Sequence, residues 1–219
     1  MQKTPDNNIY EKFHALDQEK QQRIITAAMS EFTKGYKQAS TDNIVREAGI
    51  SKGLIFHYFG TKEGLYRYLV QHAATTLQED FINLLNINQP DILEAIWQMS
   101  LLKHDISQKH PALFDFITSA YIDQTQKPEL INELFSDFME KRNQTLNNLY
   151  ANADLSLFKE DVDPQKAINI INWAMQGYGE SKTTAAKNKD STKISENYDN
   201  FLNEFKDYIA ILKKCFYKN

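Results

Sequence analysis

The stretch STDNIVREAGISKGLIFHYFGTKEGLY, residues 40–66, decides the fold of the N-terminal part of this chain. It holds two short segments with apolar residues on one side, and each ends at a glycine, Gly49 or Gly60, where a helix can stop. A helix, a tight turn and a second helix in so short a span are typical of the helix-turn-helix motif that enters DNA grooves. We therefore predict such a motif at about residues 40–59.

Residues suited to capping stand where the helices of this region should begin. Ser40 or Thr41 can cap the first helix of the motif, and Ser51 can cap the second. Thr61 can cap the helix that follows. Upstream, Asp17 precedes a segment with one apolar face, formed by Ile24, Ala27, Ala28 and Phe32. The sequence thus predicts a three-helix unit followed by a fourth helix. A loose polar arm at residues 1–16, which could be helical near its end, precedes the unit.

The second helix of the motif has two faces. Ile55 and Phe59 are about one turn apart and should point inward. The opposite face then carries Gly53, Leu54, His57 and Tyr58, beside Lys52. A histidine, an aromatic ring and a lysine together are unusual on a merely solvated surface, and they suit an element that docks into a major groove.

Charge is distributed unevenly along the chain. The whole sequence has 25 Lys and Arg against 29 Asp and Glu, a net charge of −4. Residues 20–67 hold eight basic and four acidic side chains, so this segment is +4 and the remainder −8. A basic module in an acidic protein indicates that the module alone binds a polyanion.

Composition predicts an all-α protein. The 219 residues include only 7 glycines and 5 prolines, too few for a turn-rich β-sandwich or barrel. The single cysteine, Cys215, excludes an intrachain disulfide and a cysteine-cluster metal site. No apolar run approaches the roughly 18–20 residues of a membrane span, and no secretion signal is evident, so we expect a cytoplasmic location. Later helices are expected at 91–108, 111–124, 128–152, 164–185 and 195–217, with a polar, frayed or looped stretch at 183–192.

The quoted stretch resembles the signature of the TetR family of bacterial transcriptional regulators. The matching elements are Thr41, Ala48-Gly49-Ile50-Ser51, Lys52-Gly53, His57-Tyr58-Phe59 and Lys62-Glu63-Gly64-Leu65. The resemblance covers residues 17–77 and implies a TetR-type helix-turn-helix DNA-binding domain there. It implies a helical ligand-binding and dimerisation domain at 78–219.

The resemblance also implies roles for single residues. Thr41 and Lys62 would bind backbone phosphates, and Lys52, Gly53 and Leu54 would approach base edges. The complete implied DNA-binding set is Thr41, Ser51, Lys52, Gly53, Leu54, His57, Tyr58 and Lys62, the His57 and Tyr58 side chains contacting phosphates or bases. The family often has tyrosine where this chain has Phe56, which cannot donate to a phosphate, so Phe56 could serve packing alone.

Plainer interpretations exist for four of these side chains. Thr41 could be only a helix cap, and Lys52 only a solvated charge. His57 could be a partly buried structural residue, and Tyr58 could pack against the first helix. Their grouping on one face of a helix favours the DNA-binding interpretation.

Aromatic and methionine side chains recur at helical spacing in the middle of the chain. Any one of them is explained by core packing, but together they are numerous for so few helices. The resemblance implies an inducer pocket in this region, and such side chains suit a small apolar or aromatic effector. The candidate ligand-binding residues are Trp97, Phe114, Phe116, Tyr121, Phe135, Phe138 and Met139.

The last two predicted helices suggest a homodimer. The helix at 164–185 is apolar on two sides, which indicates burial on two sides. An intrachain core explains part of this pattern, and a four-helix bundle formed with a twofold-related copy explains the rest. The candidate interface residues are Ile170, Trp173, Ala174, Gly177, Phe201, Phe205, Ile209 and Leu212.

Taken with these observations, the resemblance implies a ligand-responsive repressor that binds a palindromic operator as a homodimer and is released by its effector. No nucleophile elbow, phosphate loop or metal-spaced cluster is present, so we expect no enzyme, no cofactor and no metal. Two alternatives stay open, which are an all-helical adaptor that binds another protein and a DNA-binding activator that needs no ligand.

Overall fold

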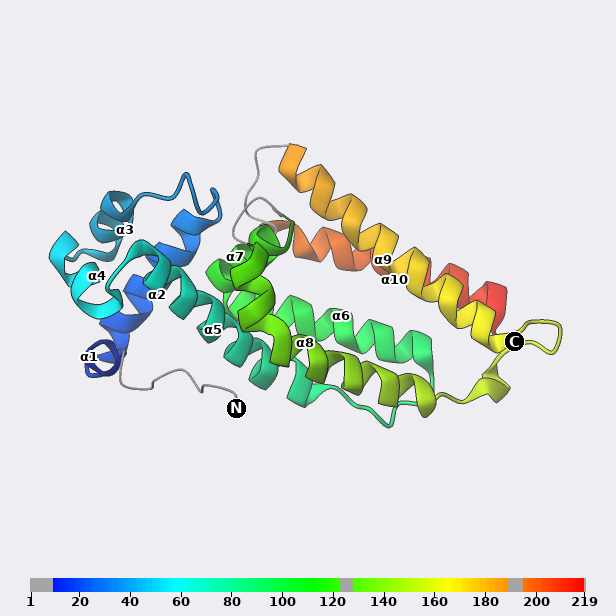
Figure 1. The fold of residues 1–219 in the computed structure, drawn as a ribbon. Coiled ribbons are helices and arrows are strands. Elements are labelled where there is room, and N and C mark those ends of the chain that lie inside the picture. Colours follow the sequence, from blue (N-terminus) through cyan, green and yellow to red (C-terminus); the bar gives the residue numbers. More distant parts are fainter. Residues whose placement is uncertain (1–9, 123–127, 189–194, 219) are drawn as a thin grey trace. The chain divides into compact units, whose positions relative to one another are not determined.

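The computed structural model describes residues 10–122, 128–188 and 195–218 (Figure 1). Its α-helices in those ranges are α1 (Glu11–His14), α2 (Gln18–Phe32), α3 (Thr41–Ala48), α4 (Lys52–Phe59), α5 (Lys62–Asp80), α6 (Ile92–Lys109), α7 (Pro111–Ile122), α8 (Pro128–Ala151), α9 (Pro164–Asn188) and α10 (Tyr198–Phe216). Short 3-10 helices lie at η1 (Ile82–Leu84), η2 (Leu155–Leu157) and η3 (Ser195–Asn197). In these ranges no strand forms, and β pairing is limited to one antiparallel bridge between Phe158 and Tyr217. The predicted all-α fold class is confirmed.

The prolines mark helix starts as predicted. Pro111, Pro128 and Pro164 each occupy the first helical position, where a missing N–H costs nothing. The expected loop or frayed stretch at 183–192 is wrong for residues 183–188, because α9 continues to Asn188. Alanine and lysine in this segment favour extension of a helix that already exists. Residues 189–192 lie outside the described ranges.

Only some of the predicted caps use their side chains. Asp17 accepts a 2.8 Å hydrogen bond from the Lys20 backbone N–H, and the Thr61 hydroxyl accepts one of 2.9 Å from Gly64. Ser40 and Ser51 occupy the N-cap positions of α3 and α4, but neither makes a side-chain cap. Thr41 is the first residue inside α3, so its interpretation as the cap is wrong.

The end of the arm predicted at residues 1–16 is helical, as the sequence allowed, but this described part is packed and not loose. Phe13 on α1 is fully buried, and its ring centroid lies 4.8 Å from that of Phe59 and 5.1 Å from that of Tyr68. Burial of one aromatic ring among others stabilises the short helix against the first unit.

The chain divides into two compact units. The first contains Met1–Thr75 and Asp115–Ser136, and the second contains Thr76–Phe114 and Asp137–Asn219. Residues 115–136 join the first unit through contacts that sequence patterns do not reveal. The Phe116 ring meets the Tyr66 ring at 5.6 Å, and the Ser119 hydroxyl donates to the Thr33 carbonyl at 2.9 Å. The domains predicted at 17–77 and 78–219 therefore differ from the spatial units by this segment.

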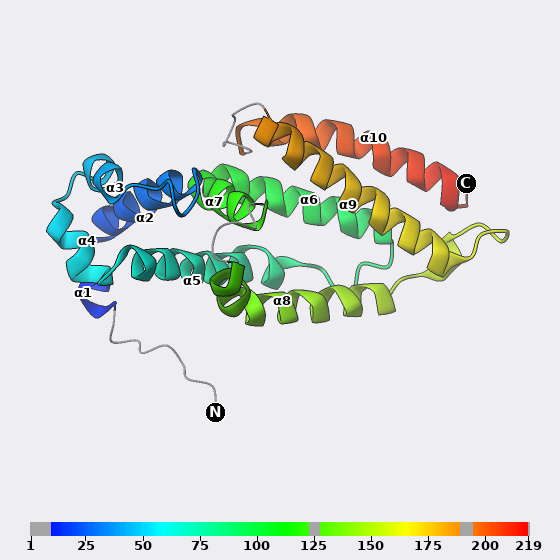
Figure 2. The ribbon, with the colours of Figure 1, turned by 45° about the horizontal axis from the view of Figure 1, so that its top comes forward.

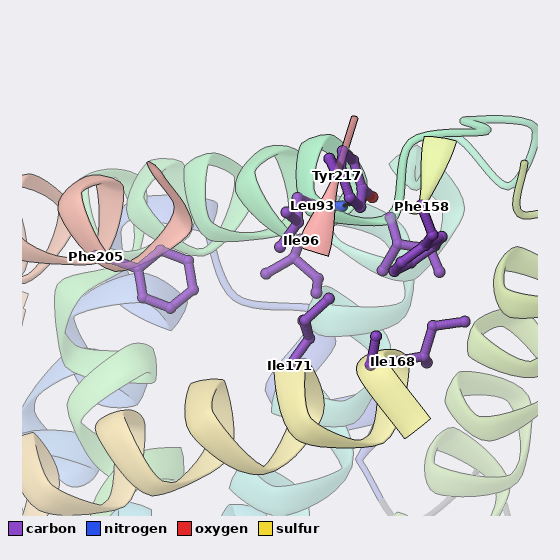
Figure 3. Packing of buried hydrophobic residues seen from close by; sticks show 9 residues of the cluster. Leu93, Ile96, Phe158, Ile168, Ile171, Phe205 and Tyr217 are labelled. Atoms are coloured by element: carbon purple, nitrogen blue, oxygen red, sulfur yellow. Dashed lines mark hydrogen bonds between the residues drawn. The ribbon is translucent and has the colours of Figure 1, made fainter. Parts of the chain in front are cut away.

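The core of the second unit gathers apolar side chains from three helices and from the chain end (Figure 3). Members from α6, α9 and α10 surround Phe158 and Tyr217; the cluster is Ile92, Leu93, Ile96, Phe158, Ala167, Ile168, Ile171, Phe205 and Tyr217. Helices α9 and α10 lie side by side (Figure 2). Burial of this apolar surface supplies the main driving force for folding of the unit.

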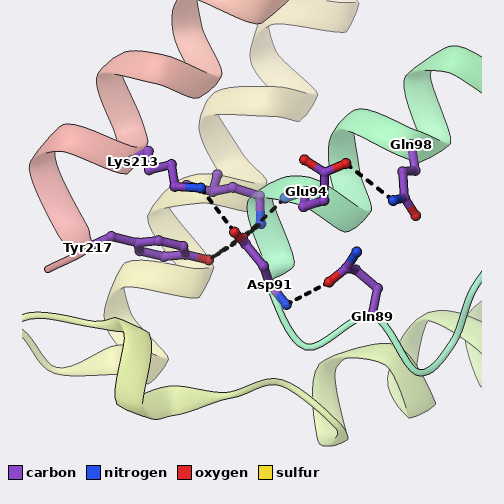
Figure 4. A network of polar contacts seen from close by, with 7 residues as sticks. Gln89, Asp91, Glu94, Gln98, Lys213 and Tyr217 are labelled. Atoms are coloured by element: carbon purple, nitrogen blue, oxygen red, sulfur yellow. Dashed lines mark hydrogen bonds and ion pairs between the residues drawn. The ribbon is translucent and has the colours of Figure 1, made fainter. Parts of the chain in front are cut away.

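A single carboxylate joins the start of α6 to the end of α10 (Figure 4). Asp91 caps α6 by accepting hydrogen bonds from the backbone of Leu93 at 2.9 Å and of Glu94 at 3.1 Å. It also accepts from the Tyr217 hydroxyl at 2.9 Å and from the Lys213 ammonium at 3.1 Å. Although burial opposes ionisation, these bonds hold the pKa of Asp91 below its usual value.

In the described part of the chain, no helix is both long and apolar enough to cross a membrane. Across the same residues, His, Cys, Asp and Glu side chains do not gather in groups of three or more that could hold a metal ion.

We expect Asp91→Ala to lower the free energy of unfolding by about 2–3 kcal/mol, because it removes a helix cap and two side-chain hydrogen bonds. Lys213→Met removes only a half-exposed ion pair and should cost less than about 1 kcal/mol. Urea denaturation of both variants, followed by circular dichroism, measures the difference. Equal decreases in the free energy of unfolding for the two variants would contradict the central role of the Asp91 carboxylate.

Candidate nucleic-acid interface

Helices α2, α3 and α4 form the module that holds the predicted DNA-binding residues other than Lys62, which begins α5. The turn between α3 and α4 depends on Gly49, whose φ of +67° is left-handed. The Ile50 N–H then closes back on the Val45 carbonyl at 3.0 Å, as in a Schellman C-cap. Glycine adopts this conformation without the steric cost that a side chain would impose, so the turn fixes the direction in which α4 leaves α3.

A buried carboxylate on α2 holds the start of α3. Glu31 is only 6% exposed, and it accepts hydrogen bonds of 3.0 Å from the Ser40 backbone N–H and from the Asn43 amide. The Lys34 ammonium completes the set at 2.6 Å. Sequence reasoning missed this residue, although an acidic side chain one position from Phe32 on the inner side of α2 was a signal that could have found it.

The surroundings of Glu31 favour its charged form. Burial raises the pKa, but the hydrogen bonds from Lys34, Asn43 and Ser40 outweigh it and hold the pKa of Glu31 below its usual value. The charged carboxylate is therefore the form that stabilises the folded module at neutral pH.

The outward side of α4 carries most of the predicted contact set. Ser51, Lys52, Gly53 and His57 are exposed, and Leu54 is half-buried. A Cβ added at Gly53 would meet no atom within 4 Å, so packing inside the chain does not require a glycine there. The absence of a side chain at this position leaves backbone exposed for the close approach of another molecule.

Tyr58 does not share that face, so this part of the prediction is wrong. Its side chain is buried, and its ring meets the ring of Phe13 edge-on at 5.9 Å. Tyr58 packs inside the unit, as the alternative interpretation held, but this contact is with α1 and not with the helix predicted at 17–32. The interpretation of Phe56 as a packing residue alone is wrong, because its side chain is 41% exposed.

Lys52 is exposed at the start of α4 and pairs with the first turn of α3. Its ammonium lies 2.7 Å from the Asp42 carboxylate. Both side chains are more than half exposed, so the pair contributes little to stability, and the ammonium can exchange Asp42 for another anion at small cost.

Lys62 points inward, unlike the phosphate-binding lysine that the sequence predicted. Its ammonium donates to the Ala39 carbonyl at 2.5 Å and lies 5.0 Å from the centre of the Tyr36 ring. Burial lowers the pKa of Lys62, and the nearby Glu31 carboxylate partly opposes that shift. Lys62 thus links the start of α5 to the segment before α3.

Thr41, which the sequence predicted as a phosphate contact, is half-buried at the first position of α3.

The seven predicted ligand-binding residues do not line one pocket. Phe116 and Phe135 face a small apolar recess in the first unit, which they share with Val70, Ile117, Ala120 and Ile131. Its volume of about 10 Å³ holds about one water molecule, far less than a drug-sized effector needs. Trp97, Phe114, Phe138 and Met139 belong to the second unit, and the Tyr121 side chain lies outside the described part of the structure.

The predicted dimer residues divide between surface and core. Ile170, Trp173, Ala174 and Gly177 are all exposed along one face of α9, and Trp173 is 69% exposed. The residues predicted on α10 lie on the core side of this helix and not on its exposed side. Phe205 is buried in the core cluster (Figure 3), and Phe201, Ile209 and Leu212 pack against that cluster. The large apolar residues that α10 exposes are instead Tyr208 and Ile211.

Comparison with known proteins agrees with this geometry. Residues 24–69, which contain the three-helix module from the middle of α2 onward, match the family model for bacterial regulatory proteins of the tetR family. The HTH-type transcriptional regulator BetI of Yersinia pestis is 34% identical over 76 residues, which are 32% of this chain and 38% of BetI. The chain therefore spans less than half the length of this curated relative. Over residues 24–69 the chain is therefore similar to the bacterial regulatory proteins of the tetR family.

Solved structures extend the likeness to nearly the whole fold. A TetR family transcriptional regulator from Chloroflexus aurantiacus has a TM-score of 0.59 at 18% identity, covering 95% of this chain and 98% of that one. The regulator FadR from Bacillus subtilis, solved with stearoyl-CoA, has a TM-score of 0.53 at 18% identity, covering 84% and 96%. At these identities the likeness concerns the helical fold alone.

We expect Glu31→Gln to lower the free energy of unfolding by about 1–3 kcal/mol at neutral pH, because a buried charged acceptor is lost. The lowered pKa of Glu31 means that its stabilisation is present above the usual value of 4.5 and is lost as the pH falls through the folded-state pKa. The difference in the free energy of unfolding between the parent protein and Glu31→Gln should therefore become smaller at acid pH. Urea denaturation across a pH series measures it, and a difference that stays constant down to acid pH would contradict this role.

Proposed function

We propose that this chain is a DNA-binding transcriptional regulator, which binds a palindromic operator as a homodimer and is released by a small-molecule effector. The observation that carries the proposal is the outward start of α4, where Lys52, exposed backbone at Gly53 and His57 stand together. The module supports this surface through Glu31 and the Gly49 turn. Sequence-specific docking needs such a rigidly held helix.

The charges of the module support a polyanion as partner. Residues 20–67 carry a net charge of +4 in a chain of −4. Lys52 is held near the outward face by an exposed ion pair that a phosphate can replace. We infer that Lys52, Gly53, Leu54 and His57 approach the groove, that Thr41 and Ser51 contact the backbone, and that Phe56 adds an apolar contact to a base or sugar. Lys62 and Tyr58 position the module from within.

An apolar stripe on α9 and α10 supports a homodimer. Ile170, Trp173 and Gly177 recur at helical spacing on α9, and Tyr208 and Ile211 extend the exposed apolar surface on the adjacent α10. A tryptophan this exposed is costly unless another surface covers it. Twofold pairing of two such helix pairs makes a four-helix bundle, and it presents two copies of α4 to successive major grooves.

An effector that binds in the helical C-terminal region would complete the regulator. The FadR regulator from Bacillus subtilis, which is similar in fold, was solved in complex with stearoyl-CoA, and this supports an effector that carries an apolar chain. Helix α5 contributes residues to both units and is suited to couple them. The effector must prefer a state that binds DNA poorly, since only such a preference shifts the equilibrium. The proposed function needs no catalytic step, and it places the protein with the chromosome in the cytoplasm.

Fluorescence anisotropy with labelled duplexes tests DNA binding. We expect DNA from upstream of the chain's own gene to bind at least about 10³-fold more tightly than random duplex, with a steep dependence on salt. Equal affinities for both duplexes, in a protein that is dimeric in solution, would favour the adaptor instead.

The variant Gly53→Ala separates fold from DNA contact. The added methyl group meets no atom of the chain, so stability should stay equal or rise by up to about 1 kcal/mol through helix propensity. DNA affinity should fall by about tenfold or more, because the methyl group stands where backbone approaches the groove. Gly179→Ala on α9, where the added Cβ also meets nothing within 4 Å, is the matched control and should leave DNA affinity unchanged.

We expect Trp173→Glu to convert the dimer to a monomer, because it places a charge in the centre of the apolar stripe. Sedimentation equilibrium measures the molecular mass, and circular dichroism checks that the fold persists. Leu155→Glu replaces another exposed apolar residue, outside the stripe, and should leave the dimer intact. A Trp173→Glu protein with the same mass as the parent would refute this interface.

A further inference from the structure

Phe56 is the large apolar side chain that the module of α2, α3 and α4 leaves exposed. It is 41% exposed, whereas Ile55 and Phe59 on the inner side of α4 are buried. Among the described residues its ring pairs with no other ring, unlike that of Phe59, which meets the Phe13 ring at 4.8 Å. A single exposed apolar side chain is ordinary on a protein surface, so its surroundings decide whether it has a function.

The surroundings of Phe56 on α4 are open backbone and polar groups. Residues three and four apart share one face of a helix, so Phe56 lies on the same face as Lys52 and Gly53, with His57 beside it. The ring does not cover Gly53, because a Cβ added at Gly53 would meet no atom within 4 Å. A molecule that approaches the backbone at Gly53 therefore meets the Phe56 ring as well.

The charges around this face favour DNA as that molecule. The Lys52 ammonium and the Arg46 guanidinium belong to side chains that are more than half exposed, and their pairs with Asp42 and Glu47 are exposed too. Residues 20–67 carry a net charge of +4. A basic surface with an apolar side chain in it suits the major groove, where apolar groups of the bases lie between two rows of phosphates.

The chemistry of the ring restricts the base that it can recognise. A phenylalanine side chain has no donor or acceptor, so it gains nothing from the nitrogen and oxygen atoms that the bases present in the major groove. Thymine alone among the four bases presents an apolar group there, which is its C5-methyl group. A phenyl ring at the edge of a base pair thus distinguishes thymine from the other bases by apolar contact.

We propose that Phe56 is a specificity-determining residue, whose ring contacts the C5-methyl group of a thymine in each half-site of the operator. This inference rests on the proposed function and specifies what α4 reads. Lys52 and the open backbone at Gly53 bring the helix close to the DNA, and the Phe56 ring selects the base at one position.

Selection from a library of random duplexes gives the first test. The duplexes that the parent protein selects should share a thymine at one fixed position of each half-site, and Phe56→Ala should select duplexes without a preference there. Leu101→Ala on α6 is the matched control, because Leu101 is 42% exposed and lies outside the module, and it should select the same duplexes as the parent. Parent-selected duplexes without a fixed thymine would overturn the proposal.

Uracil substitution gives the second test, because uracil differs from thymine only in the missing methyl group. Fluorescence anisotropy should show that the parent protein binds the selected duplex about fourfold more weakly with uracil in one half-site, and about 15-fold more weakly with uracil in both. Phe56→Ala should bind the thymine and uracil duplexes alike, and Leu101→Ala should show the same loss as the parent. Equal affinities of the parent for the two duplexes overturn the proposal, as does an undiminished loss in Phe56→Ala.

The parent measurement needs no variant, so it tests the contact even where Phe56→Ala unfolds. The two proposals also fail in distinguishable ways. A chain that selects no sequence from the library overturns the regulator and, with it, the thymine contact. A chain that selects an operator and binds its thymine and uracil forms equally overturns the contact alone.

Discussion

The carboxylate of Glu31 is the interaction on which the position of the outward helix depends. It lies on α2, and its hydrogen bonds reach the backbone of Ser40 and the side chain of Asn43, both at the start of α3. The Gly49 turn then fixes α4 relative to α3. Removal of one buried charged acceptor would leave several donors unsatisfied at once, so the orientation of α3 and α4 is determined by few atoms. Lys62 adds a second bond to the same segment, at the Ala39 carbonyl.

A carboxylate also holds a helix start in the second unit. Asp91 joins the start of α6 to Lys213 and Tyr217 near the chain end, and the pKa of this carboxylate is also lowered by the bonds it accepts (Figure 4). In both units a carboxylate satisfies helix-start N–H groups and a distant side chain or backbone group together. Because these carboxylates fix the ends of helices, the exposed faces of the helices are available for binding.

The surfaces that internal packing does not use are those with proposed functions. The start of α4 exposes Gly53 and Phe56, and α9 exposes Trp173. Each feature costs stability in the isolated chain, and each cost is recovered when DNA or a second copy of the chain covers it.

The sequence by itself determined the helices, because apolar spacing, prolines at first positions and glycines at Gly49 and Gly60 are local signals. It also determined the TetR-type motif and the two stripes of α9. Tertiary structure alone decided which side chains face outward. Tyr58 and Phe56 are aromatic neighbours on a helix that is apolar almost all round, so periodicity could not tell that Phe13 of α1 would cover the first and leave the second exposed. The inward turn of Lys62, the role of Glu31 and the register of α10 likewise depend on contacts between residues distant in the chain, which no local pattern encodes.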